Sequence, residues 1–405
     1  MQETSEFPSA RFEGPFAAPS AESLIGLSLN DPRIPTPSFV IDEERLKHNI
    51  ARAQSRCREL GVTYRPHLKT HKSIAIARMQ METPEGPATV STLAEARAFA
   101  AAGVKDILYA VGISPDKFSE VERIRRLGCD LKVILDSVEA AQALSTYCRE
   151  RTVTIPVLLE VDVDGHRSGI VPDSPHLLDA AQALTDGAQL CGVLTHAGDS
   201  YECSSIKAIT TAAENERIGI VKAAERLRVA GYRIDIVSAG SSPTLMYAKD
   251  ETGVTEMRAG VCALFDLFMS NLGVASLNDI AGGVLSTVIG RRTDKDIVLI
   301  DAGFLALSRD RGTARQKRDF GYGLVCDLSH KPLGNGNVLV AGTNQEHGLV
   351  KIPKGCGVSQ TELPLGRRII VMPNHACPTA APYAKLLLVR DGVIKAVLGH
   401  VRGWQ

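Results

Sequence analysis

The sequence contains no long apolar run, no surplus of either charge and no closely paired cysteines. A membrane-spanning helix needs about 18 or more consecutive apolar residues, and because no such run occurs we expect no membrane span. The 46 basic side chains balance 46 acidic ones, which argues against a general role on nucleic acids or membrane surfaces. The nine cysteines are scattered without a CxxC pair, a usage typical of reduced thiols in a cytoplasmic protein.

The N-terminus also lacks the basic and then apolar pattern of a signal peptide. The residues through Ser20 are rich in Pro, Ser, Ala and Glu, so we expect a loose arm there. A chain of 405 residues can bury a large core, and we expect it to form two domains.

Short β-prone runs alternate with helical runs from Thr36 to about Ile280. Asp42 is the expected N-cap of a helix that ends near Leu60. The expected strands cover residues 38–41, 62–69, 88–92, 107–111, 131–135, 157–163, 190–196 and 234–238. About eight strand–helix units predict a (β/α)8, TIM-like barrel over residues 36–280. A doubly wound sheet would show the same alternation, so the periodicity alone leaves that α/β fold open.

The pattern changes after about Ile280. Helical runs vanish, and short apolar runs such as 285–289 and 297–300 are separated by Gly, Asp and Pro. Regularly spaced short strands predict an all-β domain over residues 281–405.

Five basic side chains lie within the eight residues from Arg65 to Lys72, directly after the β-prone run 61–64. Barrel enzymes place their chemistry at strand ends. Burial and neighbouring cations favour the neutral amine of a lysine, which is the form that Schiff-base chemistry needs. On residue types alone, a solvated basic loop, or a patch that binds phosphate or nucleic acid, fits equally well.

The string Pro66-His67-Leu68-Lys69-Thr70-His71-Lys72 resembles the cofactor-lysine motif of the alanine racemase-like (fold type III) pyridoxal phosphate enzymes. Among them it is most similar to the D-serine dehydratase and D-threonine aldolase branch, over about residues 37–401. The resemblance implies that Lys69 binds pyridoxal 5'-phosphate and that His67 lies beside the cofactor. It also implies that residues 1–35 join the β-domain and that the chain forms a homodimer.

Two later strand ends carry further candidates. An arginine in a glycine-flanked turn can direct its planar fork at an oxygen, and the resemblance gives Arg167 a bond to the phenolic oxygen of the cofactor. It places His196 against the pyridine ring and makes His196 and Tyr201 catalytic candidates beside Lys69. Asp199 departs from the Gly-His-Ser-Tyr string common among the relatives, so the role of position 199 is open.

Small residues around glycines can present N–H groups to an anion. The resemblance makes two such turns a phosphate site, with these candidates: Ser238, Gly240, Ser241, Ser242, Thr244, Gly260 and Val261. Arg258 matches an arginine that faces the pyridine nitrogen in alanine racemases. Taken singly, each of these turns is more often only a turn.

His375 and Cys377 could both bind one metal ion if their strand is bent. A thiolate ligand favours zinc, with Mn or Mg as other possibilities for the divalent metal. The pair resembles the dehydratase-type His-x-Cys metal site, whereas aldolases and hydroxyaspartate enzymes tend to have His-x-Asp at this place. His347, in a string similar to one in the family, could be a further group near the metal.

The resemblance therefore implies a metal-dependent lyase that acts on small D-β-hydroxy-α-amino acids. The favoured reaction is D-serine dehydratase-like, giving a keto acid and ammonia. The alternative is aldolase cleavage to glycine and an aldehyde, as in D-threonine aldolase. An amino acid racemase would need a second base opposite Lys69, and a non-catalytic pyridoxal phosphate carrier would not need the metal motif.

Overall fold

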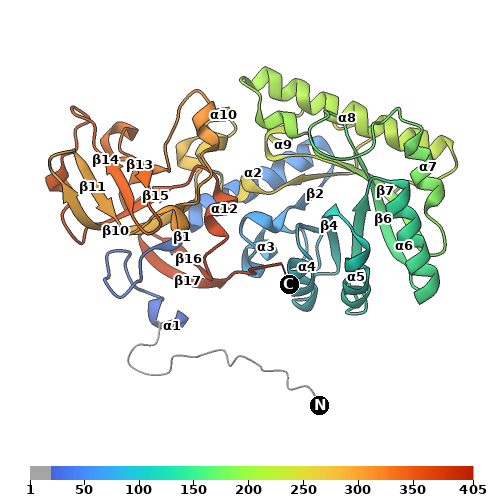
Figure 1. Ribbon diagram of the computed structural model, residues 1–405, viewed down its shortest axis with the longest axis horizontal. Coiled ribbons are helices and arrows are strands. Elements are labelled where there is room, and N and C mark those ends of the chain that lie inside the picture. Colours follow the sequence, from blue (N-terminus) through green and yellow to red (C-terminus); the bar gives the residue numbers. More distant parts are fainter. Residues whose placement is uncertain (1–19, 405) are drawn as a thin grey trace, which may run out of the picture.

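The computed structural model describes residues 20–404, which form two units side by side (Figure 1). The loose arm expected through Ser20 falls mainly on residues 1–19, outside the described part of the chain. No helix within residues 20–404 combines the length and apolar character needed to cross a membrane.

The first unit is the barrel that the sequence predicts. Its eight strands are all parallel, in the order β2-β9-β8-β7-β6-β5-β4-β3. A bridge between His67 and Thr89 brings β2 beside β3 and nearly closes the cylinder. The strands are β2 (Thr63–Pro66), β3 (Ala88–Val90), β4 (Asp106–Gly112), β5 (Asp130–Leu135), β6 (Ile155–Val161), β7 (Ala188–Thr195), β8 (Ile236–Ala239) and β9 (Glu256–Ala259).

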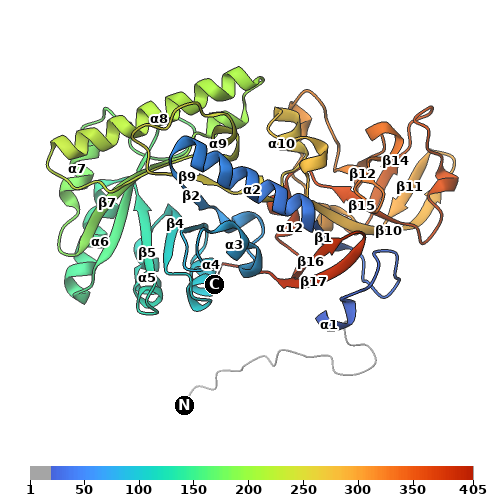
Figure 2. The same cartoon turned by 180° about the vertical axis from the view of Figure 1, so that it is seen from behind.

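Helices cover the outside of the barrel (Figures 1 and 2). They are α2 (Glu43–Leu60), α3 (Ile74–Gln80), α4 (Leu93–Ala101), α5 (Phe118–Arg125), α6 (Val138–Arg151), α7 (His176–Ala183), α8 (Ile206–Val229) and α9 (Ser242–Tyr247). The predicted cap of α2 is correct, because the Asp42 side chain accepts a hydrogen bond from the Arg45 N–H at 2.9 Å. The helix ends at Gly61, whose φ of 71° stops it.

The second unit, here called the β-domain, is built on one nine-stranded sheet in the order β11-β14-β13-β12-β15-β10-β1-β16-β17. Every pairing is antiparallel except that of β1 with β16. The strands are β1 (Ser38–Asp42), β10 (Gly282–Arg292), β11 (Ile297–Ile300), β12 (Leu324–Cys326), β13 (Leu339–Thr343), β14 (Gly348–Lys351), β15 (Arg368–Met372), β16 (Lys385–Arg390) and β17 (Val393–Gly399). Helical turns do occur after residue 280, in α11 (Phe304–Leu307) and α12 (Ala376–Ala380).

The prediction that the barrel begins at Ser38–Ile41 is wrong. This segment is β1, which pairs with β10 and β16 in the β-domain. The eighth barrel strand is β9 instead, inserted between β2 and β8. The preceding residues also lie on the β-domain: Gly26 donates its N–H to the Ile394 carbonyl at 2.8 Å, and Arg368 donates to the Ile34 carbonyl at 2.7 Å.

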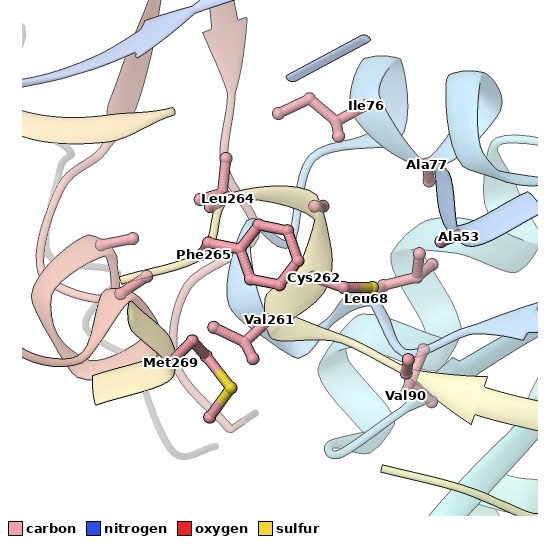
Figure 3. Packing of buried hydrophobic residues seen from close by; sticks show 14 of the residues in the cluster. Ala53, Leu68, Ile76, Ala77, Val90, Val261, Cys262, Leu264, Phe265 and Met269 are labelled. Atoms are coloured by element: carbon pink, nitrogen blue, oxygen red, sulfur yellow. The ribbon is translucent and has the colours of Figure 1, made fainter. Parts of the chain in front are cut away.

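The chain after β9 joins the two units. It forms a buried turn and then α10 (Leu267–Leu272), and Phe265 and Leu264 are fully buried there. Figure 3 shows these two side chains at the centre of the packing, with Leu68 of the barrel nearby. Asn49 of α2 donates to the Ala263 carbonyl at 3.1 Å, and α2 runs from the barrel toward the β-domain (Figure 2). This continuous core fixes the barrel mouth against the β-domain.

Candidate active site

A cavity of about 330 Å³ opens where the carboxyl ends of the barrel strands meet the β-domain. Barrel enzymes carry their chemistry at this end of the strands. Seven barrel strands, or the loops that follow them, contribute to the cavity: β2, β3, β4, β6, β7, β8 and β9. Loops of the β-domain complete it. Its charged, polar and aromatic lining consists of His67, Lys69, Ser91, Arg167, His196, Tyr201, Ser241, Ser242, Arg258, Asp266, Phe268, Asp310, His375 and Cys377.

The side chains of the basic stretch, residues 65–72, point in different directions and have different partners. His67 and Lys69 line the cavity. Arg65 is buried in the barrel, where it pairs with Glu256 and with Asp106. His71 and Lys72 also turn away from the cavity, His71 toward Gln80 at 2.6 Å and Lys72 toward Glu95 at 3.0 Å. The stretch is therefore neither a solvated basic loop nor a basic patch.

Lys69 lies on a single 3₁₀ turn, Leu68–Thr70, directly after β2. The buried neighbours Leu68 and Thr70 fix this turn. Lys69 itself is exposed, whereas the sequence led us to expect a half-buried lysine. Its amine is instead accessible from the cavity.

Two histidines of the cavity are held neutral. Burial, which is the largest effect, and the nearby cations Lys69 and Arg258 together lower the pKa of His196 to about 3. Burial, assisted by Lys69, likewise places the pKa of His67 well below its usual value. The His196 Nδ1–H is within 3.3 Å of the Gly240 carbonyl oxygen, which fixes the ring. A neutral, fixed imidazole is suited to packing against a flat heteroaromatic ring.

Arg258 reaches the cavity from β9. Its guanidinium donates to the Ser238 hydroxyl at 2.6 Å and to the Thr195 carbonyl oxygen. Ser238 in turn donates to Glu256 at 2.6 Å. Because burial dominates, the pKa of Arg258 falls to about 10, and the arginine still carries a positive charge near neutral pH.

The turns after β8 and β9 approach each other closely. Gly240 has a φ of +115°, and a Cβ there would lie 2.6 Å from the Arg258 carbonyl oxygen. At Gly260 a Cβ would lie 3.0 Å from the His67 carbonyl oxygen. Only glycine therefore fits at Gly240. Together with Ser241, Ser242 and Val261, these glycines form a wall of small residues on one side of the cavity.

His375 and Cys377 come from the β-domain, at the start of α12 rather than on the bent strand that we expected. The Ala376 N–H donates to buried Asp266 at 2.9 Å, which fixes the turn between them. The Cys377 sulfur lies 3.1 Å from the Thr70 hydroxyl. The residue next to Lys69 thus contacts the predicted metal ligand, and the two predicted sites lie in one cavity.

Asp310 is a neighbour of this pair that the sequence did not reveal. Its carboxylate lies 2.7 Å from His375 Nδ1. Burial opposes protonation of His375, but Asp310 and the Cys377 thiol outweigh it and raise the His375 pKa to about 11. The same proximity of His375 lowers the Cys377 pKa, although burial acts in the opposite direction. The lowered pKa makes the thiolate, which is the form that binds metals, easier to reach than in an ordinary cysteine.

Other predicted residues are placed differently. The hydroxyls of Ser238 and Thr244 bond to protein groups, and neither residue lines the cavity. Arg167 lines the cavity but remains exposed, with Glu160 as its nearest acid at 3.6 Å. His347 is exposed and lies outside the lining. Asp199 also lies outside it, 3.5 Å from His166.

Two family models match the chain in succession. The model of the alanine racemase N-terminal domain matches residues 41–267, and a serine dehydratase domain model matches residues 281–389. The chain belongs to the alanine racemase-like family of pyridoxal phosphate enzymes. The resemblance carried by the Lys69 motif is therefore confirmed.

Relatives of known activity match nearly the whole chain. D-threo-3-hydroxyaspartate dehydratase of Delftia sp. (strain HT23) is 48% identical, over 91% of this chain and 98% of its own length. D-serine dehydratase of Dictyostelium discoideum is 29% identical, over 88% and 93%. D-threonine aldolase of Arthrobacter sp. is 25% identical, over 93% and 97%. All three names describe lyases that act on D-hydroxy amino acids.

The solved structure of the Delftia dehydratase has a TM-score of 0.89 to this fold, covering 93% of this chain and all of that one. Two variants of that enzyme have also been solved, with alanine in place of a histidine and of a cysteine two positions further on. The structure of the cysteine variant is described as a metal-free form.

Proposed function

We propose that this protein is a pyridoxal phosphate- and divalent metal-dependent dehydratase of D-β-hydroxy-α-amino acids. The observation that carries the proposal is the shared cavity, in which Thr70, the neighbour of Lys69, contacts the sulfur of Cys377 at 3.1 Å. A Schiff-base lysine and a metal-binding pair within one cavity suit a substrate that has an amino group and a hydroxyl on adjacent carbons.

The cavity residues fit pyridoxal 5'-phosphate. Lys69 offers an accessible amine, and His67 Nδ1 is a buried polar atom without a partner in residues 20–404. The wall of Gly240, Ser241, Ser242, Gly260 and Val261 would hold the phosphate, whereas Ser238 and Thr244 would support that wall. Neutral His196 would pack against the ring, and Arg167 and Arg258 would contact its polar edge. The cofactor supplies an electron sink for a carbanion at the substrate Cα.

A metal ion would be held by His375 and Cys377. Asp310 at His375 Nδ1 leaves Nε2 as the ligand atom, which would release its proton when the metal binds. This is the usual arrangement of a metal-binding histidine and its supporting carboxylate. No group of three or more His, Cys, Asp or Glu residues suited to a metal occurs within residues 20–404. Two protein ligands leave room for substrate, and the thiolate favours zinc. The metal would supply Lewis-acid activation of the substrate hydroxyl.

Three side chains of the cavity would act on the bound substrate. Lys69 removes the proton from the substrate Cα, and His196 and Tyr201 hold the ring and substrate in place. Loss of the β-hydroxyl as water, followed by hydrolysis, gives a 2-oxo acid and ammonia. The aldolase alternative uses the same residues but breaks the Cα–Cβ bond, so it gives glycine and an aldehyde.

The relatives favour dehydration. The Delftia enzyme, at 48% identity, is a dehydratase and contains a cysteine whose removal accompanies a metal-free form. A dehydratase of hydroxyaspartate thus contains a histidine and a cysteine two positions apart, whereas the sequence pattern had led us to associate hydroxyaspartate enzymes with His-x-Asp. We therefore expect turnover of D-serine, D-threonine and D-threo-3-hydroxyaspartate, with the dicarboxylate preferred.

The test is a product assay with these three substrates. Dehydration predicts pyruvate, 2-oxobutyrate and oxaloacetate, each with one equivalent of ammonia. Glycine with an aldehyde would instead establish the aldolase reaction, and conversion to the L-amino acid would establish a racemase. Treatment with EDTA should abolish turnover, and added zinc or manganese should restore it. Full activity in the metal-free protein would contradict the role given to His375 and Cys377.

A further inference from the structure

Glu216 is a fully buried carboxylate outside the active-site cavity. It lies on α8, the long helix along the barrel in Figure 1, and is 1% exposed. Its Oε1 atom accepts hydrogen bonds from two backbone N–H groups, that of Ala197 at 3.0 Å and that of Gly240 at 2.9 Å. Its Oε2 atom has no partner within residues 20–404.

The two N–H groups belong to the two loops that face the proposed cofactor. Ala197 directly follows His196, and Gly240 directly precedes Ser241 and Ser242. The strands before these loops, β7 and β8, are neighbours in the barrel. Their chains diverge after Thr195 and Ala239, so these N–H groups have no ladder partner and need another acceptor. One carboxylate oxygen satisfies both.

We propose that Glu216 is a positioning residue that joins the ring-packing loop at His196 to the phosphate-facing loop at Gly240. This inference rests on the proposed binding of pyridoxal phosphate. A single acceptor that binds both loops fixes the distance between the imidazole of His196 and the wall of small residues. The hydrogen bond from His196 Nδ1 to the Gly240 carbonyl then closes a ring of contacts between the loops.

Neighbouring groups support a hydrogen-bonding role rather than a proton-transfer role. Burial raises the pKa of Glu216, while the Gly240 and Ala197 N–H groups oppose that rise. Glu216 is almost completely buried and does not line the cavity of Lys69. A second contact between the loops, from Ser200 Oγ to Ser241 Oγ at 2.9 Å, involves only side chains and leaves both backbone N–H groups to Glu216.

The experiment compares how tightly pyridoxal phosphate is held in the holoenzymes of four proteins: wild type, Glu216→Ala, Glu216→Gln and Glu251→Gln. Glutamine retains an acceptor oxygen, whereas alanine removes it. Glu251 is the matched control because it is buried, has an unpartnered Oε2 in the described chain, and does not bond either loop. The measurements are the dissociation constant of the cofactor, the visible circular dichroism of the bound ring, and the thermal unfolding of each apoprotein.

We expect Glu216→Ala to weaken cofactor binding about tenfold or more, because the side-chain acceptor of two backbone hydrogen bonds is lost. Its circular dichroism band should also change. Glu216→Gln should rescue both properties to within about threefold of wild type, and Glu251→Gln should leave them unchanged. If Glu216→Ala does not fold, Glu216→Asp replaces it, and its shorter side chain should bind cofactor more weakly than the glutamine variant.

Equal cofactor affinity and equal dichroism in the alanine and wild-type proteins would overturn the inference, as would equal values for the aspartate and glutamine variants. These outcomes require that the wild type binds pyridoxal phosphate. Failure of the wild type itself to bind it would instead refute the proposed function.

Discussion

At the scale of single residues, the proposed metal pair is supported by carboxylates from distant parts of the chain. The motif around Lys69 and the His375/Cys377 pair are local strings, so they can be found without the fold. Asp310 contacts His375 from 65 positions away, and Asp266 accepts a hydrogen bond from the intervening Ala376 N–H, 110 positions away. No local pattern marks either carboxylate. The fold alone brings these carboxylates to the site.

Asp310 gives the first prediction. Its carboxylate 2.7 Å from His375 Nδ1 orients the ring, so Asp310→Ala should lower metal affinity about 10–100-fold. The affinity is measured by titrating the protein with metal and determining the bound metal by atomic emission spectrometry. Asp319, an exposed acid of the same loop that pairs with Arg311, is the control, and Asp319→Ala should bind metal normally. Unchanged affinity in Asp310→Ala would show that the imidazole needs no carboxylate.

His71 gives a prediction about pH. Burial lowers its pKa to about 4, and both ring nitrogens are satisfied in the neutral form by Gln80 and the Ser73 N–H. The pKa of a histidine in the unfolded chain is near 6.5. Between about pH 6.5 and pH 4, His71 therefore binds a proton in the unfolded chain but not in the folded protein. Stability from this residue is therefore complete above about pH 6.5 and is lost as the pH falls toward about 4.

The variant His71→Gln does not titrate. Between pH 7 and pH 5 the wild type should lose about 2 kcal/mol of unfolding free energy through His71. The difference in unfolding free energy between the wild type and His71→Gln should therefore change by that amount. Urea unfolding at both pH values measures it. A stability difference that stays constant would mean that the pKa of His71 is the same in the folded and unfolded protein.

At the scale of elements, the alternation of strands and helices predicted an α/β fold of about eight units, and the family resemblance favoured the barrel over a doubly wound sheet. Neither identified every barrel strand. The run Phe39-Val40-Ile41 is fully buried, as it would be in either sheet, and only pairing with β10 and β16 decides its place. The true eighth strand, β9, has only four residues, and Glu256 and Arg258 among them are charged. Both charged side chains are buried in the barrel. Because strands were sought as apolar runs, these charges kept β9 from being recognised in the sequence.

The turn after β8 gives the prediction at this scale. In Gly240→Ala the new Cβ would meet the Arg258 carbonyl oxygen at 2.6 Å. We expect a loss of about 2–3 kcal/mol in unfolding free energy, together with weaker cofactor binding. Gly231→Ala is the control, because Gly231 also has a positive φ, +94°, but nothing lies within 4 Å of its Cβ position. It should lose about 1 kcal/mol and keep its cofactor.

Equal losses in both glycine variants would mean that the positive φ alone, and not the close approach to β9, determines the cost. Chemical unfolding of the apoproteins and cofactor titration separate the two effects.

At the scale of the whole molecule, the two units contribute different parts of one site. The barrel supplies the groups proposed to hold the cofactor, and the β-domain supplies the groups proposed to hold the metal. The sequence predicted these two units and their order. It could not show that α12 reaches the 3₁₀ turn of Lys69, because the contact between Thr70 and Cys377 spans 307 positions.

This division predicts that the two functions can be separated. Cys377→Ala should lose its metal and at least about 100-fold in activity, while it retains the cofactor on Lys69. Cys203→Ala, at a half-buried cysteine outside this cavity, should keep both. Loss of the cofactor together with the metal in Cys377→Ala would show that the two sites depend on each other.

The most direct test of the central claim is reduction of the purified protein with borohydride, followed by peptide mapping. A Schiff base between pyridoxal phosphate and Lys69 predicts one pyridoxyl group on the peptide that contains Lys69, and none on Lys72, which pairs with Glu95. A pyridoxyl group on any other lysine, or none at all in protein supplied with the cofactor, would contradict the account.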